Sequence, residues 1–226
     1  MERVSSGSRE VDEFLSGGYE TDSITAIYGP AGSGKTTLCL LGAIGAVKRG
    51  KKVLFVDTEG GISVERMGQL AGGDGSILEH CLFLRPTTFE EQKKQIEKIK
   101  DMVNDKIGLI VLDTVGMLYR VERGQSYDPY EIDNALESQI SALSEIARVK
   151  KIPVLVTNQV YDSLKNDNVK MVGGNLLGYS AKCLIELKNL TGGKIAFLRK
   201  HRSLGGKEMA FSIVEKGIIG KVENAL

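Results

Sequence analysis

The 226-residue sequence is poor in the residue types that build disulfide scaffolds and transition-metal centres. It contains no tryptophan, two histidines, three cysteines and four prolines. The cysteines, Cys39, Cys81 and Cys183, lie far apart and among apolar neighbours, so we expect reduced core residues. His80 and His201 have no second ligand at a metal-binding spacing. Neither a disulfide framework nor a transition-metal site is predicted.

Long apolar runs and a dominant charge are also missing. No stretch approaches the ~18 apolar residues of a membrane helix, and the first residues lack the apolar region of a signal peptide. Lys and Arg total 30 against 29 Asp and Glu, so no overall charge attracts nucleic acid or membrane. We therefore expect a cytoplasmic protein with no membrane partner. The length and the 42% hydrophobic content fit one α/β domain over residues 1–226.

A glycine-rich stretch at residues 29–36 matches the phosphate-binding Walker A pattern, G-x-x-x-x-G-K-[ST]. A strand-like run precedes it and a helical pattern follows it, as the motif requires. Its glycines let backbone N–H groups face an anion at a helix start. Lys35 can reach the β- and γ-phosphates, and the Thr36 hydroxyl can ligate Mg²⁺. The predicted nucleotide-binding residues are Gly29, Pro30, Ala31, Gly32, Ser33, Gly34, Lys35, Thr36 and Thr37.

Two further apolar strands are followed by acids. Asp113 ends the strand at residues 109–113 in a Walker B pattern, whose carboxylate can hold Mg²⁺ directly or through water. Glu59 follows the strand at residues 53–57. Ligands of open α/β sheets lie beyond the carboxyl ends of strands, so Glu59 could orient or deprotonate an attacking water. The alternative is a solvated acid in a turn.

Two other side chains near this edge have two interpretations each. Gln159 and its neighbour Asn158 follow the strand at residues 153–157, where an amide could contact the γ-phosphate or only satisfy loop backbone. Arg66 begins a helical segment, where its guanidinium could stack on a base or form an exposed helix pair.

Residues 119–131 and 161–175 break the periodic pattern and are predicted to be surface loops. The first mixes Arg120 and Arg123 with tyrosines, which suits phosphate contacts and base stacking in single-stranded nucleic acid, although three acids dilute the charge. The second contains Lys165 and Lys170, balanced by two aspartates.

The last third of the chain changes character. Apolar runs at residues 184–187, 195–198 and 209–214 are separated by Gly-Gly pairs, which predicts antiparallel hairpins that extend the sheet. Between residues 182 and 207 the basic residues, which include Arg199, Lys200 and Arg202, outnumber a single acidic residue, Glu186. They could contact DNA or a neighbouring subunit's nucleotide, or could simply protect strand edges.

Five motifs occur in a defined order: Gly29 to Thr36, Val-Asp57-Thr-Glu59-Gly, Leu-Ile-Val-Leu-Asp113, Val-Thr-Asn158-Gln159-Val and Gly173-Gly174-Asn175. Together they resemble the RecA/RadA recombinase family over about residues 5–214, and most closely its short archaeal accessory members. The resemblance implies a P-loop NTPase core of the RecA type. Such a core has a mostly parallel central sheet flanked by helices, here with the C-terminal antiparallel hairpins.

The same resemblance implies roles for individual residues. Glu59 would activate water, Arg66 would pack on the adenine, and Gln159 would sense the γ-phosphate and couple it to the following loop. Residues 119–131 and 161–175 would correspond to the family's two DNA-contacting loops. ATP with Mg²⁺ is the implied cofactor.

Three departures from the family pattern argue against autonomous filaments and strand exchange. The chain has no N-terminal helix-hairpin-helix domain and no Phe-x-x-Ala docking motif, and Tyr161 is the only aromatic residue of its second loop. The resemblance thus implies an accessory of DNA repair and homologous recombination with weak ATPase activity. Its expected partners are DNA, single-stranded first and double-stranded second, a RadA-type main recombinase and further copies of itself.

Two alternatives remain open from the sequence. A KaiC-like signalling ATPase or autokinase shares the RecA core, but normally carries adjacent glutamates where this chain has Thr58-Glu59. In a third hypothesis, nucleotide is only a structural ligand that orders loops for a protein partner.

Overall fold

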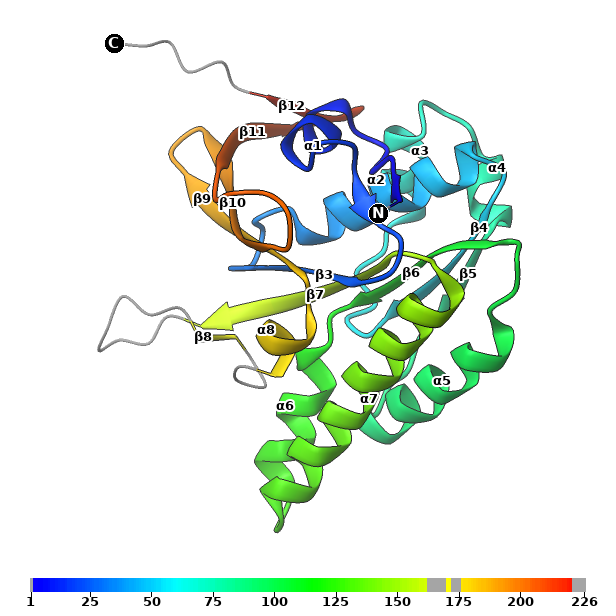
Figure 1. Ribbon diagram of the computed structural model, residues 1–226, viewed down its shortest axis with the longest axis vertical. Coiled ribbons are helices and arrows are strands. Elements are labelled where there is room, and N and C mark those ends of the chain that lie inside the picture. Colours follow the sequence, from blue (N-terminus) through cyan, green and yellow to red (C-terminus); the bar gives the residue numbers. More distant parts are fainter. Residues whose placement is uncertain (1, 162–169, 172–175, 221–226) are drawn as a thin grey trace.

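A computed structural model describes residues 2–161, 170–171 and 176–220. Its main feature is a large sheet that runs through the molecule with helices on both faces (Figure 1). The strand order is β12-β11-β10-β9-β3-β7-β6-β4-β5, with β8 paired to β7. The strands of this sheet are β3 (Ile24–Gly29), β4 (Lys52–Asp57), β5 (Cys81–Leu84), β6 (Ile107–Asp113), β7 (Val154–Tyr161), β8 (Lys170–Met171), β9 (Cys183–Leu190), β10 (Gly193–His201), β11 (Glu208–Val214) and β12 (Gly217–Gly220).

The central strands run parallel from β9 to β5 and are built from apolar runs. Side chains on both faces of such a sheet are covered by helices, which explains a continuous rather than alternating apolar pattern. In β4 the side chains from Val53 to Val56 are at most 1% exposed. The register pairs Asp57 with Asp113 and Gly29 with Gln159. Polar strand ends therefore meet at one edge of the sheet.

The helices form two layers. The first layer packs α1, α2, α3 and α4 on one face, and the second packs α5, α6, α7 and α8 on the other. Their bounds are α1 (Arg9–Phe14), α2 (Lys35–Lys48), α3 (Val64–Leu70), α4 (Ser76–Glu79), α5 (Phe89–Met102), α6 (Gly116–Gln125), α7 (Pro129–Lys150) and α8 (Leu176–Ser180). None of the described helices has the length and hydropathy needed to cross a membrane.

The predicted α/β fold with C-terminal antiparallel hairpins is confirmed. Strands β9 to β12 pair antiparallel in sequence order, and β9 also joins β3 in parallel. The hairpins thereby continue the sheet beyond the phosphate-binding strand β3. A separate two-stranded ladder forms between β1 (Arg3–Val4) and β2 (Tyr19–Glu20).

The predicted loop at residues 119–131 is wrong. Helix α6 continues to Gln125 and α7 begins at Pro129, so the two helices form a hairpin that projects from the body (Figure 1). The Asp128 carboxylate accepts hydrogen bonds from the N–H groups of Tyr130 and Glu131 at 3.0 and 3.3 Å. An aspartate cap followed by proline in the first turn starts a helix, and this signal outweighs the lack of apolar periodicity.

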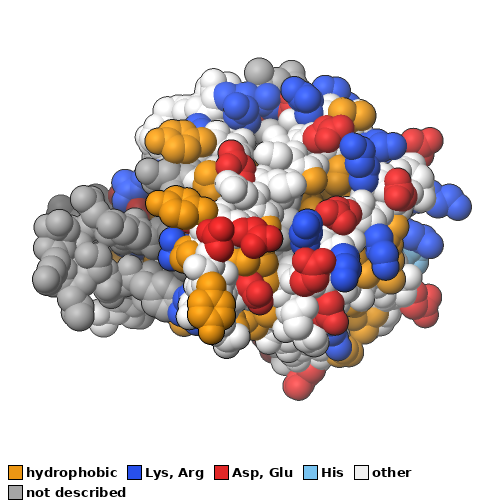
Figure 2. Space-filling view, turned by 90° about the horizontal axis from the view of Figure 1, so that it is seen from below, with side chains coloured by type: hydrophobic (Ala, Val, Ile, Leu, Met, Phe, Trp, Pro, Cys, Tyr) orange, Lys and Arg blue, Asp and Glu red, His pale blue; other side chains and the backbone are white. Residues whose placement is uncertain are grey.

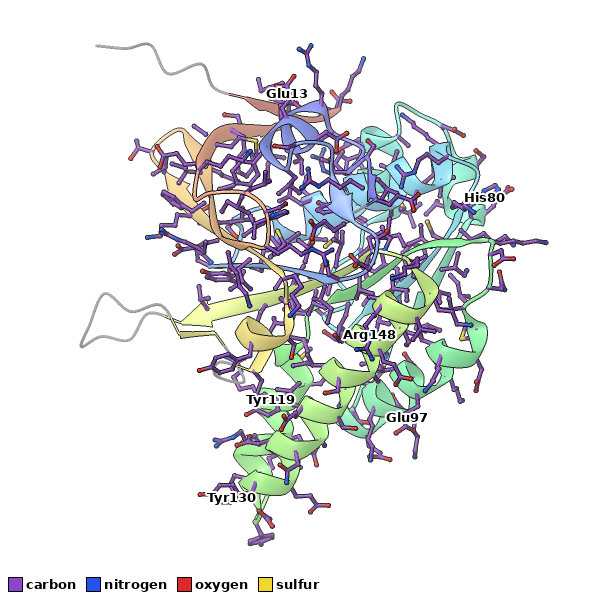
Figure 3. The ribbon with its side chains drawn as sticks, viewed as in Figure 1. Glu13, His80, Glu97, Tyr119, Tyr130 and Arg148 are labelled. Atoms are coloured by element: carbon purple, nitrogen blue, oxygen red, sulfur yellow. The ribbon has the colours of Figure 1, made fainter. Side chains whose placement is uncertain are left out.

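The hairpin tip is exposed while its base is anchored. Tyr130 lies near the free end of the hairpin and Tyr119 lies closer to the body (Figure 3). Tyr119 is 6% exposed and packs edge-on against Phe89 of α5. Of the second predicted loop, residues 162–169 and 172–175, which include Lys165, lie outside the described residues. The backbone of Lys170 and Met171 pairs with β7, so an irregular conformation is wrong at those two positions.

Candidate nucleotide-binding site

The Walker A loop links β3 to α2 and takes a conformation that suits phosphate. Gly32 and Gly34 have φ angles of 69° and 102°, a region that glycine enters without strain. A side chain at Gly29 would clash with the carbonyl oxygen of Leu187 in β9. The Ser33 hydroxyl is fully buried, with no hydrogen-bond partner among the described residues. The loop therefore keeps a polar group and backbone amides for a ligand at the start of α2.

Lys35 folds back onto its own loop. Its Nζ atom donates to the carbonyl oxygens of Gly29 and Pro30 at 2.9 and 2.8 Å. The residue is 6% exposed, and burial lowers the pKa of its amine, while the nearby carboxylates of Asp113 and Glu59 favour the charged form. An anionic phosphate can replace the neutral carbonyls as partner of this cation.

Asp113 is the last residue of β6 and is buried. Two hydroxyl groups hydrogen-bond to its carboxylate. The Thr157 hydroxyl donates to its carboxylate, and Thr36 of the Walker A loop also hydrogen-bonds to it. Burial raises the pKa of Asp113, and both hydroxyl hydrogen bonds act in the opposite direction. A hydroxyl and a carboxylate in contact supply two oxygen ligands of the kind that Mg²⁺ prefers.

Glu59 follows β4 and Gln159 lies in β7, on either side of β6, and the two side chains bond to each other. Gln159 Nε2 donates to Glu59 Oε1 at 2.6 Å, and the Thr114 hydroxyl donates to the same oxygen at 3.2 Å. The backbone around Glu59 is held by Thr58, whose hydroxyl accepts from the N–H of Thr114 at 2.8 Å. Glu59 itself is exposed, so water has access to the carboxylate.

Arg66 lies in the first turn of α3. The Ser63 hydroxyl accepts from its N–H at 3.1 Å and caps α3. Its guanidinium donates to the carbonyl oxygens of Val214 and Glu215 at 2.9 and 2.8 Å, which ties α3 to the turn between β11 and β12. The side chain is therefore held in place by backbone groups, and its proposed packing on a base remains a prediction.

The residues present fit a nucleoside triphosphate with Mg²⁺. The loop offers glycine backbone, a buried hydroxyl and a lysine, and Thr36 at the start of α2 contacts Asp113 at the end of β6. The described residues contain no cluster of three or more His, Cys, Asp or Glu side chains that could hold a metal alone. A magnesium ion bound by one carboxylate and one hydroxyl would take its other ligands from phosphates and water.

Comparisons with known proteins agree with this geometry. The family model described as Rad51 matches residues 1–221. The chain belongs to the Rad51 family. Members of this family are ATPases that use nucleotide and magnesium. The predicted resemblance to RecA/RadA recombinases is thereby confirmed.

Individual relatives of this Rad51-family chain carry a consistent description. "DNA repair and recombination protein RadB" of Methanobrevibacter smithii is 41% identical over 219 residues, covering 92% of each chain. The protein of the same description from Methanococcoides burtonii is 37% identical, with 96% and 97% covered. A solved structure, "Crystal structure of the RadB recombinase", superposes with a TM-score of 0.81 at 36% identity, covering 95% of this chain and 98% of the other.

The predicted DNA-binding cations of this family member lie in three places. Arg120 and Arg123 are on α6, and Arg123 forms an ion pair with Asp133 of α7 at 2.7 Å. The side chain of Lys170 and the whole of Lys165 lie outside the described residues. Figure 2 shows that the face seen from below carries acidic side chains close to basic ones.

The remaining three cations lie on or after β10, and each bonds within the chain. Arg199 pairs with Glu186 at 2.5 Å and stacks over the Phe197 ring. The Lys200 amine donates to the carbonyl oxygen of Gly178 at 2.8 Å. Arg202 pairs with Glu20 at 2.7 Å and also with Asp22. These contacts leave the proposed DNA contacts untested, but they give each cation a structural partner.

Several residues of the site have no sequence signal of their own. Thr157, Thr114 and Thr58 hold the catalytic candidates from neighbouring strand ends, and Asn189 and Lys194 reach the Walker A loop from β9 and β10. The sequence predicts Thr157 at the end of a strand, whereas in the structure β7 continues to Tyr161. The bond of Thr157 to Asp113 depends on the β6–β7 pairing, which no local pattern fixes.

Proposed function

We propose that this chain is a DNA repair and homologous recombination protein that binds Mg-ATP and DNA, hydrolyses ATP weakly and acts as an accessory to a main recombinase. The observation that carries the proposal is the bond between Glu59 and Gln159 beside the Walker A lysine. The candidate water-activating carboxylate and the candidate γ-phosphate sensor are thus in direct contact. The RadB description of its relatives supports the recombination role.

In this proposal each residue has a distinct task. The Walker A amides and Lys35 bind the phosphates, and Lys35 exchanges its carbonyl partners for them. Thr36 and Asp113 hold magnesium, which neutralises charge on the phosphates when bound. Glu59 accepts a hydrogen bond from the attacking water and orients it.

Gln159 supplies the coupling between the two ligands. It lies in β7, whose end pairs with β8 and continues toward the second predicted DNA loop. A γ-phosphate that accepts a hydrogen bond from the Gln159 amide would compete with the Glu59 carboxylate for that amide. The resulting shift of Gln159 would change the conformation favoured by the end of β7. DNA affinity is therefore expected to depend on the nucleotide present.

The test combines ATP hydrolysis with anisotropy of labelled single-stranded DNA in one sample across a salt series. We expect a negative salt slope and an affinity that differs between ATP and ADP. Glu59→Gln should bind ATP with unchanged affinity and lose hydrolysis. DNA binding that is absent in every nucleotide state would contradict the proposal, and unchanged hydrolysis in Glu59→Gln would remove Glu59 from the mechanism.

The comparisons do not favour a KaiC-like signalling ATPase, because the relatives carry the RadB description over nearly their full length. Incubation of the protein with ATP labelled on its γ-phosphate tests this alternative. Stable transfer of label to serine or threonine of the protein would favour an autokinase over the recombination role.

A further inference from the structure

The β9–β10 hairpin contacts the Walker A loop through residues of both strands. Asn189 and Lys194 are directly opposite one another in the β9–β10 register, and Lys194 Nζ donates to Asn189 Oδ1 at 3.0 Å. Both side chains also reach the loop. Lys194 Nζ donates to the carbonyl oxygen of Gly32 at 2.6 Å, and Asn189 Nδ2 donates to that of Ala31 at 3.3 Å.

These contacts act on the two peptide groups at the apex of the loop. A trans peptide group is planar, so its N–H points away from its carbonyl oxygen. Bonds to the oxygens of Ala31 and Gly32 therefore fix the directions of the N–H groups of Gly32 and Ser33. Because glycine has wide conformational freedom, this part of the loop needs an outside restraint to keep one orientation.

The charge of Lys194 adds a second effect. A cation bonded to a carbonyl oxygen polarises the peptide group and makes its N–H a stronger donor. Asn189 suits the other half of the contact because its amide accepts from Lys194 and donates to Ala31 at the same time. The Cβ of an added side chain at Gly34 would come within 3.0 Å of Ile213 Cδ1 and 3.7 Å of Lys194 Cδ, so β10 and β11 pack closely behind the loop.

We propose that Asn189 and Lys194 are positioning residues of the nucleotide site, which orient the Walker A peptide groups toward the phosphates from the antiparallel extension of the sheet. The inference rests on the proposed nucleotide binding. The β9–β10 hairpin then contributes to ATP affinity independently of any DNA contact. It also connects the C-terminal strands to the nucleotide through the Walker A loop.

The experiment titrates fluorescent ATP and ADP analogues into the wild type and variants. Lys194→Ala is expected to weaken both nucleotides by roughly 10-fold, the size of one charge-assisted hydrogen bond. Asn189→Asp should weaken binding more than Asn189→Ala, because both variants lose the donor to Ala31 and aspartate also brings negative charge to the loop. Lys194→Arg, which keeps the cation and its donors, should restore most of the affinity.

A matched control is Lys188→Ala in the same hairpin. Lys188 pairs with Glu186 at 3.5 Å, so its removal should leave nucleotide affinity within twofold of wild type. In steady state, Lys194→Ala should raise KM for ATP and leave kcat nearly unchanged, because Glu59 and Gln159 are untouched. Its melting temperature without nucleotide should match wild type, which a general packing defect would not allow.

The outcomes separate the two proposals. Wild-type affinity in Lys194→Ala, with nucleotide bound normally by the wild type, overturns the positioning role alone. Equal losses in Lys194→Ala and Lys188→Ala also overturn it, since they would reflect the hairpin's total charge. A wild-type protein that binds no nucleotide overturns both proposals.

Discussion

At the carboxyl edge of the parallel strands, Lys35 bonds to neutral carbonyl oxygens, whereas Arg123, Arg199 and Arg202 on the candidate DNA surfaces bond to carboxylates. A phosphate that approaches Lys35 replaces uncharged partners. A DNA phosphate that approaches one of the arginines must compete with an existing negative charge. Lys35 is therefore readier for an anionic ligand than these three arginines, and Lys200 of β10, whose amine also donates to a carbonyl oxygen, resembles Lys35 in this respect.

The difference follows from how each region is built. The nucleotide edge collects residues from β3, β4, β6 and β7, and the pairing of those strands decides which side chains meet. The arginines lie on α6 and on or after β10, and each pairs with a nearby carboxylate. The partly exposed Arg123–Asp133 pair contributes little to stability, about 0–1 kcal/mol, so DNA could open it at small cost. Arg199 and Arg202 pair with the buried carboxylates of Glu186 and Glu20, so opening those pairs would leave a buried charge without its partner.

The largest effect is expected at Lys35. Lys35→Ala removes the cation that bonds the phosphates, and we expect ATP affinity to fall by about 100-fold. Fluorescent ATP titration measures it. Lys48→Ala, at the exposed end of the same helix, is the control and should bind normally. Near-normal affinity in Lys35→Ala would contradict the contrast between the two regions, because it would show that the phosphates do not bind the Lys35 amine.

The next effect is expected at Thr157, whose hydroxyl is fully buried against Asp113. Thr157→Val keeps the shape and removes a donor to a buried carboxylate, so unfolding free energy should fall by about 1–3 kcal/mol. Urea unfolding followed by circular dichroism measures it, and magnesium-dependent ATP affinity should fall in parallel. Unchanged stability with unchanged magnesium dependence would show that Thr36 alone supports Asp113.

Smaller changes in DNA affinity, of opposite direction for the two residues, are expected at the Arg123–Asp133 ion pair between α6 and α7. If Arg123 contacts DNA phosphate, Arg123→Ala should lower affinity a few-fold and reduce the salt slope by about 0.7–0.9. Asp133→Asn keeps an acceptor for the Tyr119 hydroxyl, which bonds to Asp133 at 2.6 Å, and releases Arg123. DNA affinity should then rise. A fall in Asp133→Asn would mean that the pair positions the hairpin and that Arg123 makes no phosphate contact.

The smallest effect concerns pH. The side chain of His201 is 1% exposed, 3.7 Å from Glu20, and burial lowers its pKa against the attraction of that acid; Arg3, Arg202 and Lys207 lower it further. The unfolded chain then binds a proton at a higher pH than the folded chain. Stability should fall as pH drops from the unfolded value of about 6.5 toward the lowered folded value.

His201→Gln tests this pH dependence directly. Urea unfolding at several pH values between 8 and 5 should show a shallower acid loss in the variant than in wild type. Identical slopes would show that His201 does not cause the acid sensitivity.

Much of the site was predictable because its chemistry is encoded in short stretches. Lys35 and Thr36 occupy fixed places in the Walker A loop, and Asp113 ends an apolar strand. The α6–α7 hairpin was missed, because its outer half has little apolar surface to repeat at helical spacing. Asp128 and Pro129 carried the helix-start signal within a stretch that otherwise resembles a loop.

The sequence by itself determined the central apolar strands, the phosphate loop and the family, since each depends on neighbours along the chain or on a local pattern of apolar residues. Only the tertiary structure decided which side chains hold the loop and the acids. Thr157 reaches Asp113 across 44 residues, and Lys194 reaches Gly32 across 162. Such contacts arise from strand order and register, which depend on the packing of the whole sheet.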